Sequence, residues 1–181
     1  MGRLPEIDET RLASEQRTIF DKLNRERGHV RGPFAVWLRN AELCRHTLDL
    51  QEMFASRVKL ERRLLELTIL ISAQSGNAQY AWFIHEPHAL RLGISRDVVN
   101  AIREHRTPKF EREDERLVYD ITTELNATRQ LSELNYSRGI AAFGEEVMVE
   151  LVSAIGFYSM VAITLNAFDV TVPDGSNPLS K

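Results

Sequence analysis

Residues 66–93 read ELTILISAQSGNAQYAWFIHEPHALRLG, and this stretch gathers most of the chain's unusual chemistry into two helical segments. The first segment is strongly apolar after Glu66. Gly76-Asn77 separates it from the second segment, which closes at Gly93, a residue type that readily adopts the left-handed conformation found at helix ends. We therefore expect two helices folded back on each other as an antiparallel hairpin.

Glu66 and His85 come level with each other in such a hairpin. At the α-helical rise of about 1.5 Å per residue, Glu66 lies about 15 Å before the turn and His85 about 12 Å after it. A carboxylate among apolar residues is costly unless it is paired, and an imidazole held by a carboxylate suits proton transfer near neutral pH. An ordinary buried ion pair has the same pattern, so the residues alone leave both interpretations open.

Three aromatic residues surround this pair on the second helix. His88 lies one turn beyond His85, and Tyr80 lies at the edge of the same face. A buried Tyr80 hydroxyl needs a partner, which could be Glu66, His85 or a ligand. Trp82 is a core or interface aromatic by pattern, and a candidate ligand contact by its neighbours.

The two imidazoles of His85-Glu86-Pro87-His88 do not make a convincing metal motif. The zincin pattern His-Glu-x-x-His is one residue longer, and structural zinc sites favour four ligands with cysteine among them. The other histidines, His29, His46 and His105, are scattered, and no glycine-rich phosphate loop or nucleotide fingerprint is present. We expect neither a metal site nor a cofactor.

The size of the chain allows one sizeable hydrophobic core. Of its 181 residues, 43% are hydrophobic. Apolar spacings of three and four, rather than strict alternation, predict a nearly all-helical protein. We expect a single all-α domain over residues 1–171, with an N-terminal helical arm over 1–30, a core over 32–168 and a loose tail over 172–181.

The individual helices are placed by apolar spacing, glycine, proline and capping residues. We expect a break at residues 31–34, an N-cap at Ser95 and another at Ser132. The expected helices cover residues 9–27, 40–54, 60–75, 78–92, 96–106 and 111–124, a segment after Ser132, and 145–168. The last is apolar most of the way round, which predicts burial in the core or partly against another subunit.

Charge and cysteine content narrow the possible partners and compartment. The net charge of −3 is small and its signs are mixed, which argues against nucleic acid and anionic membranes as partners. The N-terminus lacks the apolar region of a signal peptide, and the apolar runs are interrupted short of a membrane span. The single cysteine, Cys44, fits a reducing compartment. We expect a cytoplasmic, soluble protein.

The motif resembles that of the carboxymuconolactone decarboxylase and alkylhydroperoxidase D-like superfamily, whose signature is a Glu, then about a dozen residues on a Cys-x-x-Cys, then a His. The residues that carry the resemblance are Glu66, Gly76, Tyr80-Ala81-Trp82, His85, Ala89 and Gly93-Ile94-Ser95, with Arg31-Gly32-Pro33-Phe34 and Leu38-Arg39-Asn40 upstream. It extends over roughly residues 32–168. It implies an all-helical bundle around the motif hairpin, assembled into trimers or hexamers with pockets near subunit contacts.

The cysteine positions of the family motif hold Ala78 and Ala81 in this chain. Peroxidase-like members need both thiols, because a thiolate attacks and a disulfide forms. Cys44 lies outside the motif, so alkylhydroperoxidase or peroxiredoxin-type activity is the least expected function. Decarboxylase members work without the cysteine pair and without a cofactor, on a carboxylated unsaturated lactone from aromatic catabolism.

The resemblance therefore implies a cofactor-free lyase acting by proton transfer on a small carboxylated or lactone compound. In that role His85 would supply a proton or bind the carbonyl, Glu66 would orient His85, and Tyr80 would donate to an oxygen. His88, Trp82 and Arg31 are the candidate substrate contacts. Arg39, Arg45 and Arg91 are further candidates for binding carboxylates.

One departure from the family keeps the substrate open. The position after Tyr80, often Glu in relatives, is Ala81. The alternative function is a non-catalytic family member that binds a ligand or serves as a scaffold.

Overall fold

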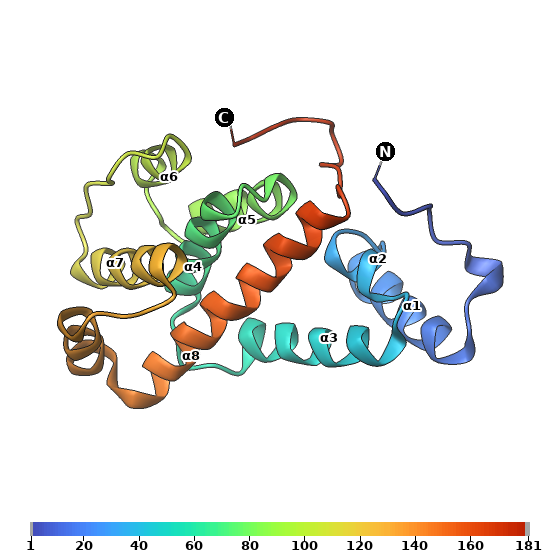
Figure 1. Ribbon diagram of the computed structural model, residues 1–181, viewed down its shortest axis with the longest axis horizontal. Helices are drawn as coiled ribbons and strands as arrows, with labels where there is room; N and C mark the ends of the chain where they lie inside the picture. Colours follow the sequence, from blue (N-terminus) through green and yellow to red (C-terminus); the bar gives the residue numbers. More distant parts are fainter. Residues whose placement is uncertain (1, 180–181) are drawn as a thin grey trace.

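The computed structural model describes residues 2–179, and all the regular secondary structure in that range is helical (Figure 1). The elements are η1 (Glu9–Arg11), α1 (Ser14–Arg27), α2 (Pro33–Trp37), α3 (Ala41–Ser56), α4 (Arg62–Ser75), α5 (Gln79–Arg91), α6 (Arg96–Arg103), α7 (Glu113–Thr128) and α8 (Glu133–Ala167). The all-α prediction is confirmed.

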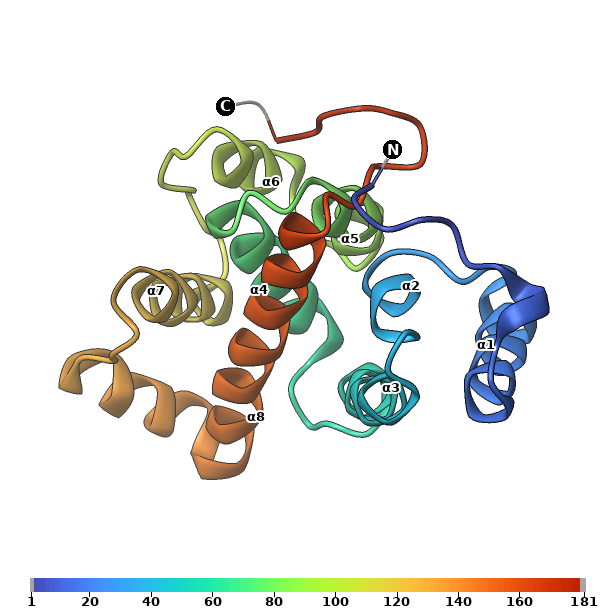
Figure 2. The ribbon, with the colours of Figure 1, turned by 45° about the vertical axis from the view of Figure 1, so that its right-hand side comes forward.

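Helix α4 is the centre of the fold. Every residue from Arg63 to Ala73 is buried, and α5, α7 and α8 all pack against it. A helix that is apolar nearly all round can be stable only when other elements cover it on several sides. Figure 2 shows this arrangement, with α1, α2 and α3 on the other side of α8 from α7.

The expected hairpin is present as α4 and α5. The two helices pack extensively, and residues 76–78 connect them. Asn77 takes a positive φ of 49° in this connection, a conformation that asparagine tolerates better than most residues. The predicted caps are also present, since Ser95 and Ser132 accept hydrogen bonds from the backbone N–H groups of Val98 and Asn135.

Helix α8 joins two segments that were expected to be separate helices. Its one residue with non-helical dihedrals is Gly144 (φ 75°, ψ 169°), which kinks the chain just before the predicted start of the last helix. Beyond the kink, one face of α8 is buried, whereas Val149 and Ile163 are each 66% exposed. By length and composition α8 could cross a membrane, and in this structure it packs against α4 and α7.

The N-terminal part differs from expectation in two places. The expected helix over residues 9–27 is divided into η1 and α1. A break was expected over residues 31–34, but only residues 31–32 of it are non-helical, because a short helix, α2, begins at Pro33. Proline suits the first helical position, where its missing N–H would have no partner.

The C-terminal segment lacks helix or strand, as expected of a tail, but it is not loose as far as Leu179. Leu179 is buried, and its backbone N–H and C=O both bond the Gln79 side chain, each at 2.8 Å. Residues 180–181, the last two of the expected tail, lie outside the described residues.

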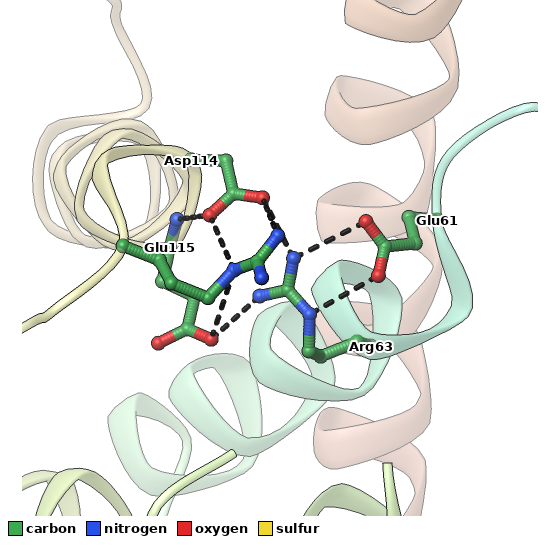
Figure 3. A network of polar contacts seen from close by, with 5 residues as sticks. Glu61, Arg63, Asp114 and Glu115 are labelled. Atoms are coloured by element: carbon green, nitrogen blue, oxygen red, sulfur yellow. Dashed lines mark hydrogen bonds and ion pairs between the residues drawn. The ribbon is translucent and has the colours of Figure 1, made fainter. Parts of the chain in front are cut away.

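Hydrogen bonds and ion pairs of Arg63 link the start of α4 to the first turn of α7 (Figure 3). Its guanidinium donates to Glu115 at 2.5 Å, to Asp114 at 2.6 Å and to Glu61 at 3.1 Å. The side chains of Arg63 and Glu115 are only 7% and 6% exposed. Neither charge has full access to water, so both depend on this network for compensation, and Arg63 is the nearest cation to Glu115.

Replacing Arg63 by Ala should lower the free energy of unfolding by about 3 kcal/mol, because buried Glu115 would lose its hydrogen-bonded partner and keep only the exposed Arg112 at 4.0 Å. Urea denaturation followed by circular dichroism measures the change. Arg106→Ala is the matched control, since its pair with Glu104 is exposed and should contribute no more than about 1 kcal/mol. Equal losses in the two variants would contradict the role given to the buried network.

Candidate functional site

A cavity of about 490 Å³ lies between the α1–α2 segment, α5 and α8. Most of its wall is apolar or aromatic, and its polar groups are few, which is the usual composition of a small-molecule site. The lining residues are Leu23, Arg27, His29, Val30, Arg31, Pro33, Phe34, Trp37, Gln51, Tyr80, Ala81, Ile84, His85, His88, Phe157, Tyr158, Val161 and Leu165.

Glu66 and His85 meet at this cavity. The hairpin places Nδ1 of His85 2.7 Å from Oε2 of Glu66, within hydrogen-bond distance. Glu66 is fully buried on α4, whereas the His85 side chain is 20% exposed and forms part of the cavity wall. Nη2 of Arg62 lies 3.0 Å from Oε1 of Glu66 as an ion pair, although it lacks the alignment of a hydrogen bond.

The ionisation of Glu66 determines how His85 is held. Burial alone would raise the pKa of Glu66, but the hydrogen bond with His85 and the charges of His85, Arg62 and His88 outweigh it and hold the pKa below its ordinary value. Glu66 is therefore ionised at neutral pH and can only accept. His85 must carry its proton on Nδ1, which leaves Nε2 to exchange a proton with a ligand.

His88 adds a second imidazole one turn further along α5. Its ring centroid lies 5.9 Å from that of His85, and it also lines the cavity. Burial lowers the pKa of His88, although the charge of Glu66 acts in the opposite direction. His88 is thus an uncharged imidazole at neutral pH, able to donate or accept a hydrogen bond.

Tyr80 lies on the cavity wall and packs against the segment that leads into α2. The Tyr80 ring packs closely against Gly32, where an added Cβ would lie 2.6 Å from the ring. The φ of Gly32 is 65°, a conformation that also favours glycine. Burial raises the pKa of Tyr80, against the charges of Arg31 and Arg27. The Tyr80 hydroxyl makes no hydrogen bond to Glu66 or His85, the protein partners that the sequence suggested.

Of the four arginines considered from the sequence, Arg31 alone lines the cavity. Arg39 instead donates to the backbone carbonyls of Pro5 and Ala35, and Arg45 contacts His46. Arg27 and His29 also line the cavity, and the Arg27 guanidinium donates to Gln51 at 2.6 Å and lies 4.7 Å from the centroid of the Phe34 ring.

Trp82 does not reach the cavity. It is fully buried, and its indole N–H donates to Glu86 at 2.8 Å. Arg103 of α6 pairs with Glu86 and lies over the indole, 5.5 Å from the ring centroid. Among the site residues chosen from the sequence, Glu66, His85, His88, Tyr80 and Arg31 gather at or directly behind the cavity wall, whereas Trp82 joins α5 to α6.

Three contributors to the site were missed by sequence reasoning. Arg62 was within reach, because it precedes Glu66 by four residues and so shares its helix face. Arg27 and Tyr158 belong to elements far from the motif, and only the packing of α1 and α8 brings them to the cavity.

The cavity wall contains no thiol. Ala81, one of the two positions where the family motif has cysteine, lines the cavity, and Ala78 is buried. Cys44 is fully buried outside the lining, and burial raises the pKa of its thiol to about 11. A thiolate nucleophile is therefore disfavoured at Cys44.

Comparison with solved structures shows the alkylhydroperoxidase D-like fold. An alkylhydroperoxidase AhpD core protein from Ralstonia eutropha JMP134 matches with a TM-score of 0.78 at 12% identity, over 99% of this chain and 98% of that one. A peroxidase-related protein from Silicibacter sp. TM1040 matches with a TM-score of 0.76 at 14% identity, over 94% and 91%. This confirms the fold that the motif resemblance implies.

A third structure with this fold is that of the debrominase Bmp8, a Cys-to-Ala variant in complex with 2,3,4-tribromopyrrole. It matches with a TM-score of 0.74 at 17% identity, over 96% of this chain and 91% of that one. No protein-family model and no curated protein sequence matches the chain. At these identities the comparisons establish the fold and leave the activity to the site.

Replacing Gly32 by Ala should lower the free energy of unfolding by about 1–3 kcal/mol, because the new methyl group meets the Tyr80 ring at a positive φ. Thermal or urea denaturation measures it. Gly156→Ala in α8 is a control for which the opposite effect is expected, since nothing lies within 4 Å of the added Cβ. Alanine should there stabilise the helix by about 0.5–1 kcal/mol. A neutral Gly32→Ala variant would contradict the close packing of Tyr80.

Replacing Glu66 by Gln should destabilise the protein by about 1–2 kcal/mol at pH 7, and the difference should shrink as the pH falls below 4.5. A lowered folded-state pKa means that ionised Glu66 stabilises the fold above its ordinary value of 4.5, and that this contribution is lost as the pH falls through the folded pKa. Urea denaturation of the wild type and the variant at pH 7 and at pH 4 measures the stability difference at each pH. The exposed Glu111→Gln control should change little, and a gap that widened in acid would refute the ionised pair.

Proposed function

We propose that this chain, which has the alkylhydroperoxidase D-like fold, is a cofactor-free proton-transfer lyase that acts on a small carboxylated or lactone compound. The observation that carries the proposal is the Glu66–His85 hydrogen bond at the wall of an apolar cavity. A fully buried carboxylate that fixes the tautomer of a cavity-facing imidazole is an arrangement suited to general acid catalysis near neutral pH.

The reaction can be written for a carboxylated unsaturated lactone. The bond between the ring carbon and the carboxylate breaks, CO2 leaves, and the electron pair passes into the conjugated carbonyl to give a dienolate. A proton then adds to carbon. His85, protonated from solvent, would deliver that proton from Nε2, while Glu66 would stabilise the imidazolium that precedes transfer.

The cavity matches a small ring compound with an acidic substituent. Its volume of about 490 Å³ lies within the usual range for small-molecule sites, and Phe34, Trp37 and Phe157 offer apolar faces to a ring. Arg31 and Arg27, which also line the cavity, could receive a carboxylate, with Tyr80 donating to one of its oxygens. The debrominase of similar fold has a small substituted ring, 2,3,4-tribromopyrrole, as its ligand.

The alternative is a non-catalytic member of the same fold that binds such a ligand. The predominantly apolar wall of the cavity favours binding whether or not chemistry follows. Alkylhydroperoxidase or peroxiredoxin-type activity is the least favoured function, because Ala81 replaces a thiol at the cavity and Cys44 is buried elsewhere.

We propose that the protein is cytoplasmic and assembles as a homo-oligomer, a trimer or a hexamer. Val149, Val152 and Ile163 form an exposed apolar stripe on α8, and a second subunit would cover it. Light scattering coupled to size-exclusion chromatography would measure the mass.

Carbon dioxide release and the change in ultraviolet absorbance with carboxymuconolactone test the proposed lyase. We expect turnover by the wild-type protein and a loss of about 10²–10⁴-fold in His85→Gln, because the variant has no imidazole to transfer a proton. His46→Gln, whose side chain does not line the cavity, is the matched control and should keep wild-type turnover. Saturable binding without turnover in the wild type would reject the lyase for this substrate and favour the binding role.

A further inference from the structure

Tyr158 is the residue of α8 that meets the Glu66–His85 pair. Its ring lies edge-on to the His85 ring, with centroids 5.7 Å apart and an angle of 81° between the planes. Phe157 packs against Tyr158 in a similar edge contact at 5.2 Å. Both tyrosine and histidine rings line the cavity, so the Tyr158 ring is fixed beside the imidazole that faces a ligand.

The hydroxyl of Tyr158 has no hydrogen-bond partner among residues 2–179, although only 6% of the residue is exposed. The fully covered polar side-chain atoms without a partner belong to Glu66, Arg103 and Thr122, so the Tyr158 hydroxyl keeps some accessible surface. The Tyr158 side chain forms part of the cavity wall. A nearly buried hydroxyl is normally satisfied, which makes a ligand in the cavity the candidate partner.

The charges that act on the two cavity tyrosines differ in part. Burial raises the pKa of Tyr80 while Arg31 and Arg27 act against it. For Tyr158, burial and then the charge of Glu66 raise the pKa, with Arg62 and Arg27 acting against them. Tyr158 packs on the His85 ring, and it stays protonated, a hydrogen-bond donor, throughout the neutral range.

We infer that the Tyr158 hydroxyl donates a hydrogen bond to the carbonyl oxygen of the ligand that His85 faces, and so stabilises the enolate that forms there. This rests on the proposed function for the identity of the ligand, an unsaturated lactone or a related carbonyl compound. A neutral donor fixed by packing is effective at this place, because it need not reorganise as negative charge develops on the oxygen.

The two cavity hydroxyl groups then have different roles. Tyr158 binds the oxygen on which charge develops, whereas Tyr80, whose pKa is influenced by Arg31 and Arg27, is left to help bind a carboxylate. Removing the Tyr158 hydroxyl should therefore lower the rate of the chemical step by about 10²-fold, the usual effect of deleting one such donor.

Tyr158→Phe tests this, because it removes the hydroxyl and keeps the ring that packs on His85 and Phe157. The direct probe is butenolide, the simplest unsaturated lactone, whose carbonyl stretch in the infrared falls in frequency when its oxygen accepts a hydrogen bond. We expect a lowered stretch for butenolide bound to the wild-type protein and a smaller shift with Tyr158→Phe. Tyr119→Phe on α7, which does not line the cavity, should behave as wild type.

A dihydrofuran, which has the ring but no carbonyl, completes the test. The wild-type protein and Tyr158→Phe should bind it equally well, and circular dichroism should show the same helix content in both. An equal carbonyl shift in the two proteins, or no saturable binding of butenolide to the wild type, would overturn the inference. None of these readouts needs turnover, so a lowered carbonyl stretch beside a failed decarboxylase assay would reject the proposed reaction alone.

Discussion

The site depends on one buried carboxylate. Glu66 belongs to α4, the helix that α5, α7 and α8 enclose, and it has no exposed surface of its own. A charge at such a place is stable only with partners, which are His85 across the hairpin and Arg62 one turn earlier. The same apolar packing that makes α4 the core of the fold therefore fixes the orientation of the imidazole at the cavity.

The sequence carries enough information to predict the hairpin and its central contact. Helical spacing, the Gly76-Asn77 turn and the rise per residue place Glu66 beside His85 without any knowledge of the other helices, because the contact is local. The remaining cavity wall comes from α1, α2, the loop between them, α3 and α8, whose approach to α5 depends on tertiary packing. Tyr158 follows His85 by more than seventy residues, and Trp82, which shares the helix with His85, is covered by α6 instead.

Two differences between the expected and the observed structure have simple physical causes. A break was expected through Phe34, but a single glycine with positive φ completes the turn and Pro33 can start a helix at once. The tail was expected to be loose because its composition is polar and rich in proline and glycine, yet Leu179 is buried, and its backbone accepts one hydrogen bond from the Gln79 side chain and donates another to it. Two buried apolar residues, Val172 and Leu179, and the Gln79 amide thus attach a segment that has no helix or strand of its own.

Arg62 gives the site a connection to the surrounding water. Its side chain is 39% exposed, while the oxygen that it faces belongs to a carboxylate with no exposure at all. The charge balance of the buried pair is thus completed from outside, by a residue that does not line the cavity. Salt, or a substitution at this one surface position, can alter the charge balance around Glu66 while the residues that line the cavity stay the same.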